Sequence, residues 1–269
     1  LDPWVTPQAY DNAKEFFDTG ITWSNSLNVA QMLDKSSYSI SLGNTHQDGI
    51  ISSTGMDRYN VKVSADTKLT NNWSSGFTAN YITTSIDKAV TSGNGLLRTV
   101  YAAPPSYDLA GIPSHVDGNQ YTQNSFRGSF DNAYWAMENN KFTEDTNRFF
   151  GNVYASYQTD FGTTNHKLNA KYMVGVDAYT THYVDSYGYG SNTGGGRGQI
   201  ENYGWTNATY NSLLTINYDW HINEDWGLNA VLGNEIIQSN RKKYYEYGTN
   251  YNFPGWNHIN NATTQQTEE

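Results

Sequence analysis

The stretch Arg58-Tyr59-Asn60-Val61-Lys62-Val63-Ser64-Ala65-Asp66-Thr67-Lys68-Leu69 decides the fold class, because its side chains alternate in polarity. Apolar residues stand at 59, 61, 63, 65 and 69, and charged or polar residues fill the positions between them. Successive side chains of a β-strand point to opposite faces of the sheet. The stretch is therefore predicted to be a strand with one apolar and one wet face.

The same period of two recurs along the chain, which predicts an all-β, antiparallel protein. The pattern gives eight strands, most of them longer than the usual five or six residues of globular sheets. The seven others lie at about 21–29, 38–42, 73–81, 149–157, 168–178, 208–220 and 226–236. One short helix is expected before them, with Thr6 as N-cap, Pro7 at its first position, residues 8–17 as its body and Gly20 as its stop.

Short and long connections alternate between these strands. Tight turns are predicted around residues 34–35, 70–72, 161–165 and 223–225, and long connections at 45–57, 87–147, 184–199 and from 239 onward. In an up-and-down sheet every second connection lies at the same end, so one end carries only turns and the other only loops. That asymmetry is typical of bacterial outer-membrane β-barrels, whose long loops are extracellular.

Five aromatic residues lie beside the predicted short turns, where an interfacial girdle of a membrane barrel belongs. They are Trp73, Tyr157, Phe161, Trp220 and Trp226. The alternative interpretation is that they fill the core of a soluble β-sandwich, since alternation alone does not distinguish lipid from a protein core.

Composition excludes several classes of protein. The 269 residues include no Cys, carry a net charge of -10 and contain 15% aromatic and 16% charged residues. Nucleic acid is a poor partner for so acidic a chain, and spanning helices are excluded because no apolar run approaches the required ~20 residues. Weak charge and many aromatics argue against disorder. The six His show no metal-ligand spacing, and no catalytic or cofactor motif is found, so neither an enzyme nor a metal site is expected.

Two groups of motifs stand out along the chain. The first is Asn12-Ala13-Lys14-Glu15-Phe16-Phe17-Asp18-Thr19-Gly20, followed by Gln47-Asp48-Gly49-Ile50-Ile51 and Arg58. The second, more specific group is Arg127-Gly128-Ser129-Phe130-Asp131-Asn132-Ala133-Tyr134-Trp135 with Asn147-Arg148-Phe149-Phe150-Gly151-Asn152. Together they resemble the SusC/RagA family of TonB-dependent outer-membrane transporters. Ala133 stands where family members tend to have Pro. The resemblance covers most of the chain from Asp11 to about Tyr245.

The resemblance implies an antiparallel transmembrane barrel segment, with these strands forming part of a 22-stranded barrel that follows a plug. It divides the chain into a short helix and linker at 1–20, barrel strands at 21–240 with a folded extracellular excursion at 87–147, and an extracellular loop region at 241–269. Both ends look unfinished, so we expect a piece of a larger protein. The implied function is import of oligosaccharides or peptides across the bacterial outer membrane, without chemistry. The implied partners are a SusD-like surface lipoprotein as lid, TonB acting through the absent plug, and the lipid bilayer.

Five residues of the long loops are candidates for contact with a ligand or partner: Tyr134, Trp135, Tyr187, Tyr189 and Arg197. Aromatic rings stack on the apolar faces of sugars, and guanidinium groups donate hydrogen bonds to hydroxyls. The alternative for each is that it braces a loop or contacts the lid protein, because exposed aromatics also mark protein interfaces.

Two other functions fit parts of the sequence. A complete eight-stranded outer-membrane barrel with a structural or adhesive role would close on itself, with side chains filling its interior. A soluble glycan-binding β-domain would use the aromatics without facing lipid, but it would not need loops sorted to one end.

Overall fold

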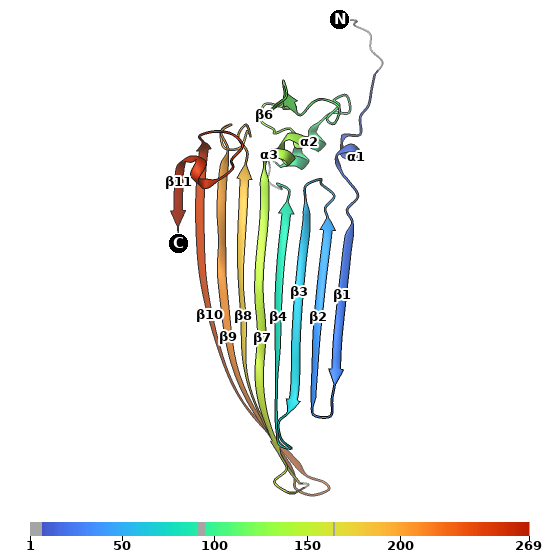
Figure 1. The fold of residues 1–269 in the computed structure, drawn as a ribbon, viewed down its shortest axis with the longest axis vertical. Coiled ribbons are helices and arrows are strands. Elements are labelled where there is room, and N and C mark those ends of the chain that lie inside the picture. The colour runs from blue at the N-terminus through green and yellow to red at the C-terminus, as the bar shows by residue number, and fades with distance from the viewer. Residues whose placement is uncertain (1–6, 91–94, 164, 269) are drawn as a thin grey trace, which may run out of the picture.

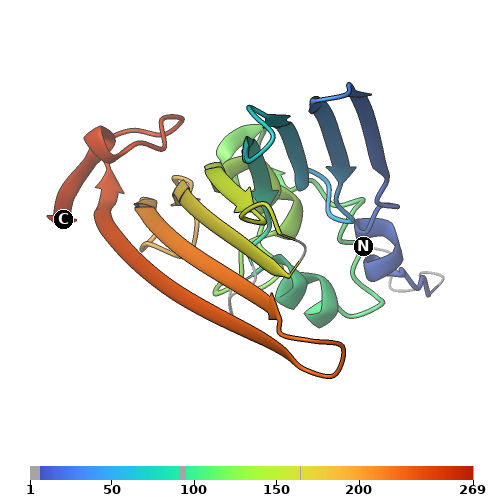
Figure 2. The same ribbon diagram turned by 90° about the horizontal axis from the view of Figure 1, so that it is seen from below.

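The computed structural model describes residues 7–90, 95–163 and 165–268. Its main element is one antiparallel sheet of nine strands in the order β1-β2-β3-β4-β7-β8-β9-β10-β11 (Figure 1). The strands are β1 (Thr22–Met32), β2 (Ser36–Asp48), β3 (Gly55–Lys68), β4 (Trp73–Lys88), β7 (Lys141–Thr159), β8 (His166–Tyr187), β9 (Gln199–His221), β10 (Gly227–Tyr251) and β11 (Ala262–Glu268). The sheet is curved and twisted, as its end-on view shows (Figure 2).

All eight predicted strands are confirmed, and β11 is a ninth. The division at residue 241 is wrong as a strand boundary, because β10 continues to Tyr251 and pairs with β9 as far as Thr249. β11 then pairs with the end of β10, so only residues 252–261 connect the two, including the short helix η1 (Ile259–Asn261). Beyond residue 240 both faces of β10 carry polar side chains such as Lys242 and Lys243, so the apolar alternation ends while the backbone pairing goes on.

The predicted alternation of connections is confirmed. The four short turns lie at one end of the sheet, here called the turn end, and the longer connections lie at the other, the loop end (Figure 1). The predicted long connections were too long, since β2 runs to Asp48 and β3 begins at Gly55. At the loop end the strands extend several residues past the apolar alternation. Backbone pairing shows this extension, and the sequence pattern does not.

Register places the apolar residues of successive strands on one face of the sheet. Leu42 pairs with Val61, Val61 with Tyr81, and Tyr81 with Phe149. Farther on, Val153 pairs with Val174 and Leu232 with Ile216. This apolar face is uncovered in the described part of the chain, with Val153 53% and Leu232 65% exposed.

The opposite, polar face carries the residues that alternate with this band. Ser64 pairs with Thr78, Thr78 with Asn152, and Gly175 with Asn211. Arg148 Nε and Nη2 donate to the Asp177 carboxylate at 2.8 and 2.5 Å, and Tyr154 Oη donates to Asp66 at 2.6 Å. One sheet thus separates an apolar surface from a hydrogen-bonded polar surface.

The predicted short helix is present but shorter than expected. Helix α1 (Asn12–Phe16) has Asp11 as its N-cap, whose carboxylate accepts the Lys14 N–H at 3.1 Å. The predicted N-cap Thr6 lies outside the described residues. Pro7 precedes the helix, which begins where Asp11 can cap it.

Between β4 and β7 the chain makes a folded excursion at the loop end (Figure 1). It contains α2 (Leu96–Ala102), the hairpin β5 (His115–Val116) and β6 (Asn119–Gln123), and α3 (Ala133–Asn139). Its buried core joins both helices to α1 and the β2–β3 connection, and consists of Phe16, Ile51, Leu96, Val100, Leu109, Ala133, Trp135 and Ala136. The excursion expected at 87–147 is folded, but it is shorter, because β4 runs to Lys88 and β7 begins at Lys141. Its extracellular position stays a prediction.

A buried carboxylate ties this excursion to the connection between β8 and β9. Asp131 accepts Gln123 Nε2 at 2.7 Å, the Asn192 N–H at 2.7 Å and Ser191 Oγ at 2.5 Å. Three donors satisfy the buried charge, which would otherwise be costly. The residue 188–198 connection is thereby held against the excursion. No helix of the described chain is long and apolar enough to cross a membrane.

Candidate functional site

Aromatic and charged side chains gather on the polar face near the loop end, beyond the apolar alternation of the strands. Tyr183 of β8 and Tyr203 of β9 are cross-strand partners, and their rings stack with centroids 4.8 Å apart and planes 6° apart. Lys88 Nζ lies 4.6 Å from the Tyr183 ring centroid and 3.4 Å from Glu144 Oε2. Alternation puts these side chains on one face because their strands are in register.

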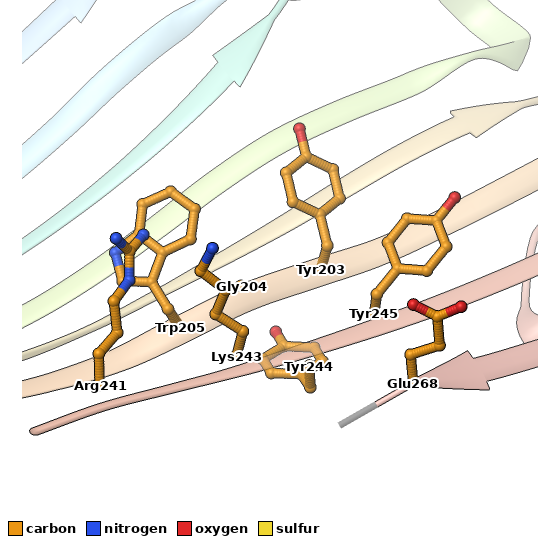
Figure 3. A pocket seen from close by; sticks show the side chains of 8 residues that line it. All are labelled: Tyr203, Gly204, Trp205, Arg241, Lys243, Tyr244, Tyr245 and Glu268. Carbon is orange, nitrogen blue, oxygen red and sulfur yellow. The ribbon is translucent and has the colours of Figure 1, made fainter.

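A hollow of about 420 Å³ adjoins this cluster. Its lining residues lie on β9, on β10 and at the end of β11, where Glu268 pairs with Tyr245. Figure 3 shows its side chains: Arg241 lies against Trp205, Tyr203 and Tyr245 lie side by side, and Glu268 lies next to Tyr245. The Arg241 guanidinium carbon is 4.8 Å from the Trp205 ring centroid. A volume of this size is within the range of small-ligand pockets.

Tyr203 also borders a second hollow, of about 540 Å³, toward β4 and the excursion. Ile50, Lys88, Phe142 and Tyr187 line this second hollow. The two hollows meet at Tyr203, so an extended ligand on the polar face could contact both.

The hydroxyl of Tyr203 is held as a neutral donor. It donates to Asp185 Oδ2 at 3.1 Å. Burial and, after it, the adjacent Asp185 carboxylate raise the pKa of Tyr203 to about 12. The group therefore remains protonated at neutral pH and offers no negative charge to a ligand.

Of the five residues predicted to contact a ligand, Tyr187 borders one of the two hollows. It lines the second hollow, and its ring contacts Phe142 edge to face with centroids 5.2 Å apart. Tyr189 instead packs against the small core of Ile200 and Tyr251. Arg197 is exposed in the 188–198 connection, where its Nη2 donates to the Tyr251 carbonyl at 3.2 Å.

Trp135 does not have the exposure that a ligand-contacting side chain needs. It is 0% exposed in the core of the excursion, and its Nε1 donates to the Gln120 carbonyl at 2.9 Å. Neighbouring Tyr134 is half-buried and meets Phe16 edge to face, with centroids 5.3 Å apart. Both side chains brace the excursion in this structure, and the five predicted residues do not form one pocket.

Sequence reasoning missed Trp205, Arg241 and Tyr245. The sequence contains a pattern that could have found them. Every second residue, on the polar face, is aromatic or cationic, at Tyr203 and Trp205 in β9 and at Arg241, Lys243 and Tyr245 in β10. Treating the chain after 239 as loop hid the second series.

The predicted girdle residues lie near the turn end. Trp73 and Tyr157 are cross-strand partners with ring centroids 5.0 Å apart, and Trp220 stacks on His166 at 5.6 Å. Phe161 is 59% and Trp226 69% exposed. Their place at a membrane interface stays a prediction. The described residues hold no group of three His, Asp or Glu that could bind a metal ion.

No protein-family model and no curated protein matches this sequence. Among solved structures, chains of the RagAB peptide importer match all of this chain, with TM-score 0.76 at 15% identity in its closed-closed state and 0.77 at 13% in its open-open state. A structure of the RagAB peptide transporter gives 0.73 at 14%. The chain has a partial RagA-like fold.

This chain spans 31% of the length of each of those chains. The RagA-like fold agrees with the predicted antiparallel barrel segment, and the structural neighbours are transporters rather than enzymes. At this sequence identity the likeness concerns the fold alone.

Proposed function

We propose that this chain is part of an outer-membrane transporter that imports a peptide or an oligosaccharide. The observation that carries the proposal is the uncovered, in-register apolar face backed by a polar face. Lipid would cover the first face and a water-filled lumen the second, which is the arrangement of transmembrane barrels.

The height of the apolar band supports a membrane-spanning role. Along β8 the apolar alternation runs from Leu168 to Ala178. Ten residue steps at ~3.3 Å, tilted by about 40°, give a height of roughly 25 Å. That matches the apolar band of outer-membrane barrels, and strand residues beyond it would stand above the bilayer.

The partners of the proposal follow from the same arrangement. The loop end would face outward, where a SusD-like lipoprotein would close over the excursion and the hollows. TonB would supply energy from the periplasm through a plug. The solved RagAB structures, described as a peptide importer, support the transport role and favour a peptide among the candidate substrates.

The two other functions are less well supported. A closed eight-stranded barrel would join its first and last strands, whereas β1 and β11 are the unpaired ends of a nine-stranded order among the described residues. A soluble glycan-binding domain would leave large apolar side chains such as Leu232 in water along a whole sheet face, which is unfavourable for a soluble protein.

Transport is tested by deleting the gene that encodes this chain in its native bacterium and measuring uptake of labelled peptide and oligosaccharide mixtures. We expect the deletion strain to stop taking up some components of one mixture, and we expect the intact gene to restore their uptake. Inactivation of TonB should cause the same loss. Unchanged uptake of both mixtures in the deletion strain would contradict the proposal.

A further inference from the structure

Two cations on the polar face of β10 have no acidic partner in the described chain. Arg241 and Lys243 are exposed and two residues apart, so both point to the same face, roughly 7 Å apart along the strand. On the same face, Lys88 pairs with Glu144 and Arg148 with Asp177.

Both cations border the 420 Å³ hollow, whose other lining residues are mostly aromatic. Tyr203 and Trp205 form one side and Tyr245 another, and the Lys243 side chain rises from β10 between Trp205 and Tyr203 (Figure 3). Glu268, at the edge of the hollow, is its one acidic residue among those described. Its carboxylate accepts Gln266 Nε2 at 2.8 Å. The hollow therefore combines a net positive charge with flat apolar walls.

Arg241 is oriented for recognition of an anion. Its guanidinium lies over the Trp205 ring, 4.8 Å from the centroid. A guanidinium held over an aromatic ring by cation–π attraction can still donate N–H hydrogen bonds to a ligand. The N–H donors of a guanidinium match the two oxygens of a carboxylate, and the Lys243 ammonium adds a point charge.

We propose that this hollow is a subsite for a carboxylate on the transported ligand, with the ligand's apolar body against Tyr203 and Tyr245. The inference rests on the proposed function, since it assigns the polar face to the transport pathway. An acidic side chain of a peptide and a uronic acid unit of an oligosaccharide both present this chemistry.

The test uses the complete transporter that contains this chain, purified in detergent, and calorimetric titration with two matched pairs of ligands. One pair is a Glu-containing peptide and its Gln analogue, both amidated at the C-terminus. The other is a uronate oligosaccharide and its carboxyl-reduced form. The variants are Arg241→Gln and Lys243→Gln, and the control is Lys242→Gln, which removes the same charge from the opposite face of β10.

We expect the wild type to bind the carboxylate member of one pair about tenfold more tightly, because a charge-assisted hydrogen bond contributes that much. Arg241→Gln and Lys243→Gln should each reduce this preference several-fold or abolish it, and Lys242→Gln should leave it unchanged. The pair that shows the preference identifies the source of the carboxylate.

Three results would overturn the subsite: equal binding within both pairs, no binding of either carboxylate ligand, or an equal effect of Lys242→Gln. Failure of the transport proposal is distinguishable from these results. If the preference and its sensitivity to Arg241 and Lys243 are found but deletion of the gene leaves uptake unchanged, the subsite stands and the transport role fails. If deletion abolishes uptake but the pairs bind equally, only the subsite fails.

Discussion

At the scale of single residues, burial decides what an aromatic side chain in the excursion does. Trp135 is an aromatic residue of the kind that often contacts ligands. In the structure it lies on α3, which Asn132 caps, and its side chain is buried in a core with Phe16, Ile51 and Leu109. Those partners are far apart in the sequence, so a residue's position in a long connection does not predict its burial. Tyr187 differs because β8 carries it onto the polar face, beside a hollow.

Replacing Trp135 with Ala should therefore unfold the excursion locally and leave the sheet intact. Removing a fully buried Trp costs about 3–5 kcal/mol, and the core it would leave is small. Limited proteolysis of the membrane-embedded protein should show new cleavage within residues 95–140. The control is Tyr101→Ala, at a side chain that is 69% exposed, which should leave the cleavage pattern unchanged. Equal protease resistance of Trp135→Ala and wild type would contradict this role.

At the scale of elements, the period of two predicted the strands well because each has one apolar face. All eight predicted strands and the sorting of turns and loops are found in the structure. Strand ends were predicted too short wherever both faces become polar, as in β10 beyond residue 240. Hydrogen bonding between backbones continues there without a hydropathy signal, and the residues around Arg241 were missed for the same reason.

A charge introduced on β7 should reduce folding on the apolar face and be tolerated on the polar face. Val153→Arg places a guanidinium on the apolar face, where lipid would make it cost about 2–4 kcal/mol near the membrane centre. Asn152→Arg, the matched control, places it on the polar face one residue away. We expect Val153→Arg to reduce the folded yield in outer membranes, measured by heat-modifiable electrophoretic mobility, and Asn152→Arg to keep it near wild type. Equal yields would argue against lipid contact at Val153.

At the scale of the whole molecule, the sheet is organised along its long axis. The turn end carries exposed aromatics such as Trp226, the middle carries the apolar band, and the two hollows lie toward the loop end. The excursion lies at the loop end (Figure 1). Lys88 and Phe142 of the sheet line a small cavity together with Ala136 and Met137 of α3, so the excursion lies beside the polar face. A ligand moving along that face would pass Tyr187 and Tyr203 first. The sequence predicted the axis and its two ends, but the cross-strand register that joins β8, β9 and β10 into one surface requires the structure.

The proposed function requires that one face of this sheet contacts lipid and the other contacts water. These 269 residues contain no Cys, so single Cys substitutions at residues 149–157 of β7 can each carry a spin label in the complete protein reconstituted in bilayers, once any Cys elsewhere in it is replaced by Ser. We expect high accessibility to oxygen, which concentrates in lipid, at odd positions such as 149, 153 and 155. At 150, 152 and 154 we expect high accessibility to a water-soluble nickel reagent. Uniform accessibility to the aqueous reagent along all nine positions would contradict this arrangement of the two faces.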